Sequence, residues 1–140
     1  MENVAQENLK KLDALIKRGK QIIKLDFINF QPICQFSNIK AGQVFDVNGN
    51  EVIMIENDES KIIWSCNSLP NVGYPMHFHE CDEVIEMIAG NGTLYIDRGS
   101  NDPQEIILKE GQKIKIGKFI SHSFFNKENI YIHYKVTHIK

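Results

Sequence analysis

Two histidines, His77 and His79, stand two positions apart at the start of the segment HFHECDEVIEMIAGNG, residues 77–92. In an extended strand, side chains two positions apart lie on one face, so both imidazoles are expected to point the same way. Neutral imidazole is a common metal ligand. The pair can therefore take two adjacent positions around one metal ion, and further ligands must come from other segments.

Glu83 is the third candidate ligand, and it follows His79 after room for a bend at residues 80–82. The next residues on its face of the expected strand are apolar: Ile85, Met87, Ala89. A carboxylate among apolar side chains is costly unless it is paired or bound to a metal. His122 is the fourth candidate, because the distant segment GQKIKIGKFISHSFFN (111–126) reads as a strand and a turn that leads into it.

Cys81 offers alternatives, because it continues the alternation of the two histidines. A structural zinc site formed by His77, His79 and Cys81 is one of them, and a redox-active or nucleophilic thiol is another. Acidic neighbours disfavour a thiolate and raise its pKa, so we expect no chemical role for Cys81. The acidic residues expected on the solvent side are Glu80, Asp82, Glu86. Cys34 and Cys66 are interpreted as small apolar residues.

The spacing of these candidates resembles the first motif of the cupin family, His-x-His-x3-Glu-x6-Gly, which is met by His77, His79, Glu83 and Gly90. The second cupin motif, Gly-x5-Pro-x-Gly-x2-His-x3-Asn, is matched in register by Gly111, His122 and Asn126. Three positions depart from the family pattern. Gly117 stands at the proline, Phe119 at the second glycine, and Asn71 at the glycine that usually opens the first motif. The resemblance covers about residues 50–137.

The resemblance implies an all-β double-stranded β-helix, or jelly-roll barrel. It implies one divalent metal ion, iron, manganese, nickel or zinc, held by His77, His79, Glu83 and His122. Cupins include dioxygenases, isomerases and non-catalytic sugar-binding or effector-binding proteins, and they are often dimers. We therefore expect a metal-dependent enzyme of oxygenase type that acts on a small molecule, in a homodimer. A non-catalytic binding or sensing protein is the alternative.

The elements around these motifs are predicted from periodicity. Apolar residues at helical spacing predict a helix over residues 2–18, which gives an N-terminal helix (1–19) ahead of a barrel (20–140) with core motifs at 73–126. Asn48-Gly49-Asn50 is a hairpin signal. About nine short strands with frequent turn signals favour a β-sandwich or small barrel. The expected strands include 22–30, 43–47, 51–57, 60–67, 92–97, 104–109, 113–117 and 129–139.

Several other side chains are candidates for the wall of a pocket or for plain core packing: Tyr74, Trp64, Phe124, Tyr134. The two tyrosines are also the only plausible catalytic bases beyond the ligands. Ile130, Ile132, Tyr134 and Val136 share one face and are expected to line the barrel. His133 and His138 are expected at the surface, and Lys113 and Lys115 in solvent.

Composition excludes several classes of function. The chain has 140 residues, 42% of them hydrophobic, and a net charge of −2, which favours one globular domain and gives no basic surface for nucleic acid. No apolar run approaches the roughly 18 residues of a membrane-spanning helix. The polar N-terminus lacks the apolar core of a signal peptide, so a cytoplasmic location without a membrane partner is expected.

Overall fold

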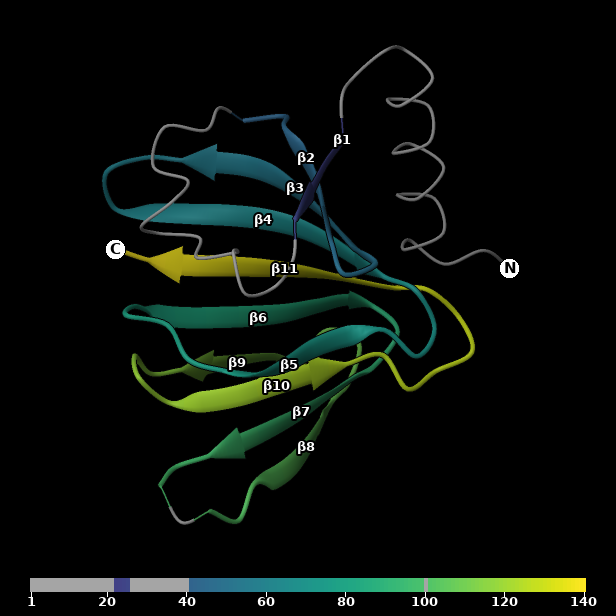
Figure 1. Cartoon of the computed structure of the whole chain (residues 1–140), viewed down its shortest axis with the longest axis vertical. Helices are drawn as coiled ribbons and strands as arrows, with labels where there is room; N and C mark the ends of the chain where they lie inside the picture. Colours follow the sequence, from purple (N-terminus) through teal and green to yellow (C-terminus); the bar gives the residue numbers. More distant parts are fainter. Residues whose placement is uncertain (1–21, 26–40, 100) are drawn as a thin grey trace.

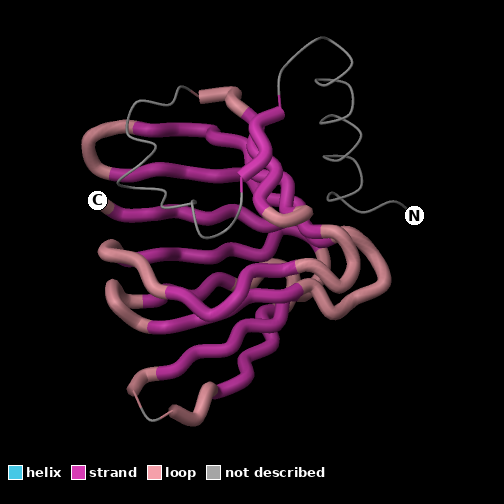
Figure 2. The backbone as a smooth tube through the Cα atoms, in the orientation of Figure 1, coloured by secondary structure: helices cyan, strands magenta, loops and turns pink. Residues whose placement is uncertain are grey.

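The computed structural model describes residues 22–25, 41–99 and 101–140, and within these ranges every regular element is a β-strand (Figure 2). The predicted helix over residues 2–18 lies outside the described residues, as does the predicted strand 22–30 beyond Leu25. In the described ranges, no helix is long and apolar enough to cross a membrane. The all-β prediction is therefore confirmed for this part of the chain.

Two sheets make up the fold (Figure 1). The larger sheet has the strand order β1 (Ile22–Leu25), β2 (Val44–Val47), β3 (Asn50–Asn57), β4 (Lys61–Ser68), β11 (Ile132–Ile139), β6 (Asp82–Ala89), β9 (Lys113–Ile116). The smaller sheet has the order β5 (Gly73–His77), β10 (Ser121–Phe125), β7 (Gly92–Asp97), β8 (Gln104–Leu108). All neighbouring strands are antiparallel except β1 and β2, which are parallel.

Turn chemistry fixes where the strands reverse. Asn48 and Gly49 have φ values of 52° and 87°, so the hairpin between β2 and β3 turns through two residues with positive φ, as a type I′ hairpin requires. Gly90 has φ 79° directly after β6, and β7 starts at Gly92 in the other sheet. The predicted hairpin is confirmed.

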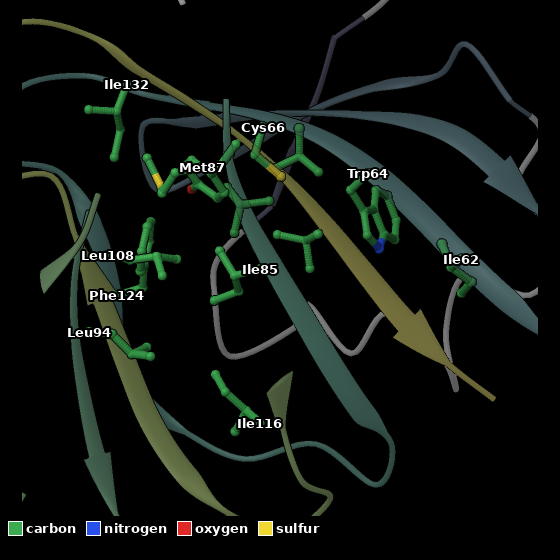
Figure 3. Packing of buried hydrophobic residues seen from close by; sticks show 14 of the residues in the cluster. Ile62, Trp64, Cys66, Ile85, Met87, Leu94, Leu108, Ile116, Phe124 and Ile132 are labelled. Carbon is green, nitrogen blue, oxygen red and sulfur yellow. The ribbon is translucent and has the colours of Figure 1, made fainter. Parts of the chain in front are cut away.

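The core lies between the two sheets, and Figure 3 shows its side chains between the ribbons. Strict alternation places one face of β6 in this core, with Ile85 and Met87 at most 2% exposed. Trp64 packs edge-on against Phe45 at a ring separation of 6.1 Å. The largest fully buried side chains are Trp64, Tyr134, Phe45, Met54, Ile62, Met87, Leu94, Ile96, Ile132. Burial of such side chains contributes about 1.5–3 kcal/mol each.

Two features of strand pairing position the later site. His122 of β10 is paired with His77 of β5, so these residues lie opposite each other on neighbouring strands. β11 lies between β4 and β6, so its lining side chains can contact both. β11 starts at Ile132 rather than at residue 129, and Ile130 is 38% exposed, so the prediction that Ile130 lines the barrel was wrong.

Candidate metal site

Four side chains from three strands and one loop converge at one end of the pocket between the sheets. One ligand atom from each of His77, His79, Glu83 and His122 lies within 4.8 Å of every other. His77 ends β5, His79 follows in the loop, Glu83 stands near the start of β6 and His122 lies on β10. The structure thus brings together all four residues that the sequence predicted as metal ligands.

Glu83 is at the centre of this cluster. Its Oε2 atom lies 2.7 Å from His122 Nε2 and 3.7 Å from His79 Nε2. Glu83 Oε2 and His122 Nε2 are both fully buried, yet neither has a partner with hydrogen-bond geometry. Buried polar atoms in native proteins almost always have a partner, so this close but misaligned pair needs an explanation.

Backbone carbonyls set the orientation of two imidazoles. His77 Nδ1 lies 2.6 Å from the carbonyl oxygen of Pro75, and His122 Nδ1 lies 2.8 Å from that of Ile120. A carbonyl only accepts, so each Nδ1 carries the proton and donates it. In the neutral ring the lone pair is then on Nε2, which is the arrangement that metal-binding histidines adopt.

Burial controls the protonation of the cluster. It lowers the pKa of His77 to about 4 and that of His79 to about 3, so both rings are neutral at pH 7. Burial also acts against a charged His122, but contact with the Glu83 carboxylate outweighs it and raises the His122 pKa. Burial would raise the pKa of Glu83, and the contacts with His122 and His138 instead lower it well below its usual range. Glu83 is therefore an anion in this cluster.

The turn before β10 contains Phe119, one of the two positions at which this chain departs from a cupin glycine. Phe119 has φ 64°, a left-handed conformation that glycine adopts without strain and bulky residues rarely adopt. Its N–H donates to the carbonyl oxygen of His79 at 2.8 Å, which ties this turn to the ligand loop. Asn71, at the other departure, has φ 63°. Both positions where cupins have glycine thus adopt positive φ in this chain.

The cluster opens onto a pocket with about 470 Å³ of space, its mouth included. Trp64, Tyr74, Phe124 and Tyr134, the four candidates from the sequence, all line it. Phe124 and Tyr134 also pack on each other in the core, edge to face with 4.8 Å between ring centroids. Both residues therefore line the pocket and belong to the core, the two roles that the sequence left open. The described lining contains no Lys or Arg, and Lys113 and Lys115 are exposed as predicted.

A chain of hydroxyl groups runs from the pocket into the core. Asn50 Nδ2 donates to backbone carbonyls, and Ser68 donates to Asn50 Oδ1 at 2.5 Å. With its proton used there, Ser68 Oγ accepts from the Tyr134 hydroxyl at 2.8 Å. Tyr134 in turn accepts from Tyr74, with which it forms a side-chain hydrogen bond. Both phenolic protons are therefore used within this chain.

His133 and His138 are buried, 8% and 3% exposed, so the prediction that they lie at the surface was wrong. His133 donates from Nδ1 to the carbonyl oxygen of Cys66 and lies outside the cluster. His138 lines the pocket, with Nε2 3.4 Å from Glu83 Oε1. The signal was present in the sequence, because His138 continues the alternation of Ile132, Tyr134 and Val136.

Neither Cys66 nor Cys81 belongs to the cluster, and Cys34 lies outside the described residues. Cys81 is buried and is not among the grouped ligand atoms, so the alternative zinc site with His77 and His79 is not what the structure assembles. Cys66 lies in the core, where burial raises the pKa of its thiol. Glu80 is exposed, while Asp82 and Glu86 are partly exposed and pair with lysines, as expected for residues on the solvent side.

No family model and no curated protein matches the chain, but many solved structures do. A cupin domain from Bordetella pertussis Tohama I is 16% identical, with a TM-score of 0.55, and the match covers 66% of this chain and 94% of that one. The Schizosaccharomyces pombe Cnp3 cupin domain is 10% identical, with a TM-score of 0.58, over 65% of this chain and 61% of that one.

Hydroxypropylphosphonic acid epoxidase from S. wedmorenis is 13% identical, with a TM-score of 0.58, over 66% of this chain. The match spans about half of that enzyme, 51% of its chain. Matches at identities this low support the fold and nothing beyond it. Two mainly antiparallel sheets, the paired ligand strands and these likenesses together show that the chain has a cupin fold, with a His/Glu cluster that resembles a cupin metal site.

Proposed function

We propose that the chain binds one divalent metal ion through His77, His79, Glu83 and His122 and acts on a small molecule as a metal-dependent enzyme of oxygenase type. The observation that carries the proposal is the pair Glu83 Oε2 and His122 Nε2, buried 2.7 Å apart in close contact but without the alignment of a hydrogen bond. A cation that both atoms bind would satisfy both. Three imidazoles and one carboxylate suit iron, manganese, nickel or zinc.

The donor set fits a metal that keeps an open position. A five- or six-coordinate ion bound by four protein atoms retains one or two sites for substrate or dioxygen, and it supplies Lewis-acid or redox chemistry there. Solved neighbours include the epoxidase that crystallised as Fe(II)-HppE with an alternative substrate. That likeness supports an iron enzyme as a candidate, and its low identity, 12%, carries nothing about the substrate.

The charge of the pocket limits the substrate class. Glu83 is the only acidic residue of the described lining, and no described Lys or Arg lines it. A divalent ion and one carboxylate leave a net charge of about +1 in an apolar surrounding, where an uncompensated charge is costly. This favours a small substrate with a single anionic metal-binding group and an otherwise apolar body.

The hydroxyl chain bears on the reaction type. Tyr74 donates to Tyr134 and Tyr134 donates to Ser68, and burial raises both phenolic pKa values, so neither is a suitable general base. This favours redox chemistry at the metal over proton abstraction. It equally favours the second candidate, a non-catalytic protein that binds or senses a small molecule through the metal.

Metal content of protein purified without added metal tests the site. We expect about one equivalent in the natural chain and a large loss in His122→Ala and Glu83→Gln. His133→Gln is the matched control, because His133 is also a buried imidazole on a neighbouring strand but lies outside the cluster. Unchanged metal content in both cluster variants would show that the site is assigned wrongly.

Oxygen consumption separates enzyme from binder. The iron-loaded protein is presented with a panel of thiols, diketones and phenols, each with one anionic group, and Glu83→Gln serves as the inactive reference. Substrate-dependent oxygen uptake supports the enzyme. Thermal stabilisation by a panel member without turnover, for iron, manganese, nickel and zinc alike, supports the binding protein instead.

A further inference from the structure

A second layer of side chains stands behind Glu83 on the side away from His122. Trp64 Nε1 lies 3.0 Å from His138 Nδ1, and both side chains are buried. On the far side of the same imidazole, His138 Nε2 lies 3.4 Å from Glu83 Oε1. The three residues come from three adjacent strands, β4, β11 and β6, so strand pairing holds them in a row.

The protons in this row can be assigned by their chemistry. An indole Nε1–H only donates, so His138 Nδ1 must present a lone pair to Trp64. The proton of the neutral imidazole is then on Nε2, which has no other partner and lies beside Glu83 Oε1. This is the opposite tautomer from His77 and His122, whose Nδ1 atoms donate to backbone carbonyls.

The tautomer decides whether His138 can be a metal ligand. A neutral ring that accepts at Nδ1 has no lone pair on Nε2, so binding a metal there would require an imidazolate or the loss of the Trp64 hydrogen bond. The hydrogen bond from the Trp64 indole N–H therefore distinguishes His138 from the three histidines that are proposed as ligands. A donor at Oε1 also leaves Oε2 as the carboxylate oxygen closest to His79 and His122.

We propose that Trp64 fixes His138 in the Nε2–H tautomer, and that His138 acts as a positioning residue which donates to Glu83 Oε1 and presents Oε2 alone to the metal. The part that concerns the metal rests on the proposed function above, whereas the tautomer is a property of the metal-free chain. Partners that orient a ligand in this way typically contribute about 10–100-fold to metal affinity.

The tautomer is measured first, in ¹⁵N-histidine-labelled protein without metal near pH 8, by long-range proton–nitrogen correlation. We expect a protonated Nε2 and an unprotonated Nδ1 for His138, and the reverse for His77 and His122. In Trp64→Phe, the preference of His138 should be lost. A protonated Nδ1 on His138 in the natural chain would overturn the proposal whether or not the protein binds a metal.

Metal affinity is measured next, by competition with a chelator for zinc and cobalt. His138→Phe keeps the ring and removes the donor, and we expect a loss of about 10–100-fold with an altered cobalt absorption spectrum. His138→Gln restores a donor at the position of Nε2 and should return affinity to within a few-fold of the natural chain. Equal losses in both variants would show that His138 itself ligates the metal, and no loss in either would show that it has no positioning role.

Discussion

Two buried polar clusters among the described residues differ in how fully their atoms are hydrogen-bonded. The first, around Asn50, Ser68, Tyr134 and Asn126, is connected by hydrogen bonds of 2.5–3.1 Å. The second, around Glu83, His122 and His138, leaves buried atoms on all three without one. The same fold thus satisfies one cluster by itself and leaves the other incomplete, which supports the proposed division of roles, stability for the first cluster and metal binding for the second.

The largest effect is expected at Asn126, in the satisfied cluster. Its Nδ2 atom contacts the carbonyl oxygens of Ser68, Leu69 and Ile130. Asn126→Leu leaves these carbonyls without that donor and should lower the free energy of unfolding by roughly 3–4 kcal/mol. Urea unfolding of the metal-free protein measures it. Zinc should raise the free energy of unfolding of the variant as much as that of the natural chain. Loss of this increase would mean that the two clusters are not independent.

The converse result is expected at Glu83. Glu83→Gln should reduce metal affinity by more than about 100-fold, equivalent to about 2.7 kcal/mol, because the anion at the centre of the ligands is lost. The free energy of unfolding of the metal-free protein should change by less than about 1.5 kcal/mol, since His122 loses its proton once the carboxylate is gone and no uncompensated charge stays buried. A large destabilisation together with unchanged metal affinity would reverse the assignment of the two clusters.

The pH dependence of stability sharpens the same contrast. The pKa values of His77 and His79 are lowered to about 4 and about 3 in the folded chain, whereas unfolded histidines titrate near 6.5. As pH falls from about 6.5 to 4.5, the unfolded chain binds protons that the folded chain does not, so stability is lost. Burial lowers the pKa of His133 as well, which adds to the loss, and the raised His122 pKa opposes it only in part, so the slope exceeds the value for one proton, about 1.4 kcal/mol per pH unit.

Urea unfolding of metal-free protein at a series of pH values measures the slope. His79→Gln should flatten it, because one of the three histidines with a lowered pKa is removed. Tyr134→Phe, in the satisfied cluster, should lower stability at every pH and leave the slope as it is. A slope that His79→Gln does not change would show that the cluster histidines do not carry the pH dependence.

The smallest effect is expected at the turn that joins the ligand loop to β10. Phe119 has φ 64°, so Phe119→Gly should stabilise the chain by about 0.5 kcal/mol, with the loss of strain partly offset by the entropy of glycine. Asn71→Gly, at φ 63°, should have less effect because asparagine tolerates this conformation. Thermal unfolding of both variants measures the difference, and a destabilised Phe119→Gly would show that the Phe119 side chain matters more than its backbone.

Much of the site could be predicted from the sequence because its ligands are marked by residue types and spacings within short segments. Two histidines at alternate positions, a carboxylate among apolar residues and a register shared with a second segment identified four residues that the structure brings within 4.8 Å. The hairpin at Asn48-Gly49 was equally local, since positive φ is a property of those residue types. Alternation likewise placed Ile132, Tyr134 and Val136 on the buried face.

His138 was missed because it was considered as a single residue rather than as the next member of that alternation. Its contacts could not be predicted in any case, because they depend on the register of β11 against both β4 and β6. The hydroxyl chain from Tyr74 to Asn50 depends in the same way on residues that are distant in sequence. The ligand residues can be predicted from motifs, whereas the residues that contact the ligands depend on the register between paired strands.

The pairing of His77 with His122 has a further consequence for motion. β5 is an edge strand of the smaller sheet and is paired there only with β10 among the described residues. A metal held by both histidines would act as a clasp between the edge strand and its neighbour, closing a loop of 45 positions between residues 77 and 122. Release of the ion would then be governed by fraying of β5, so the amide hydrogens of this strand should report the occupancy of the site through their exchange with solvent.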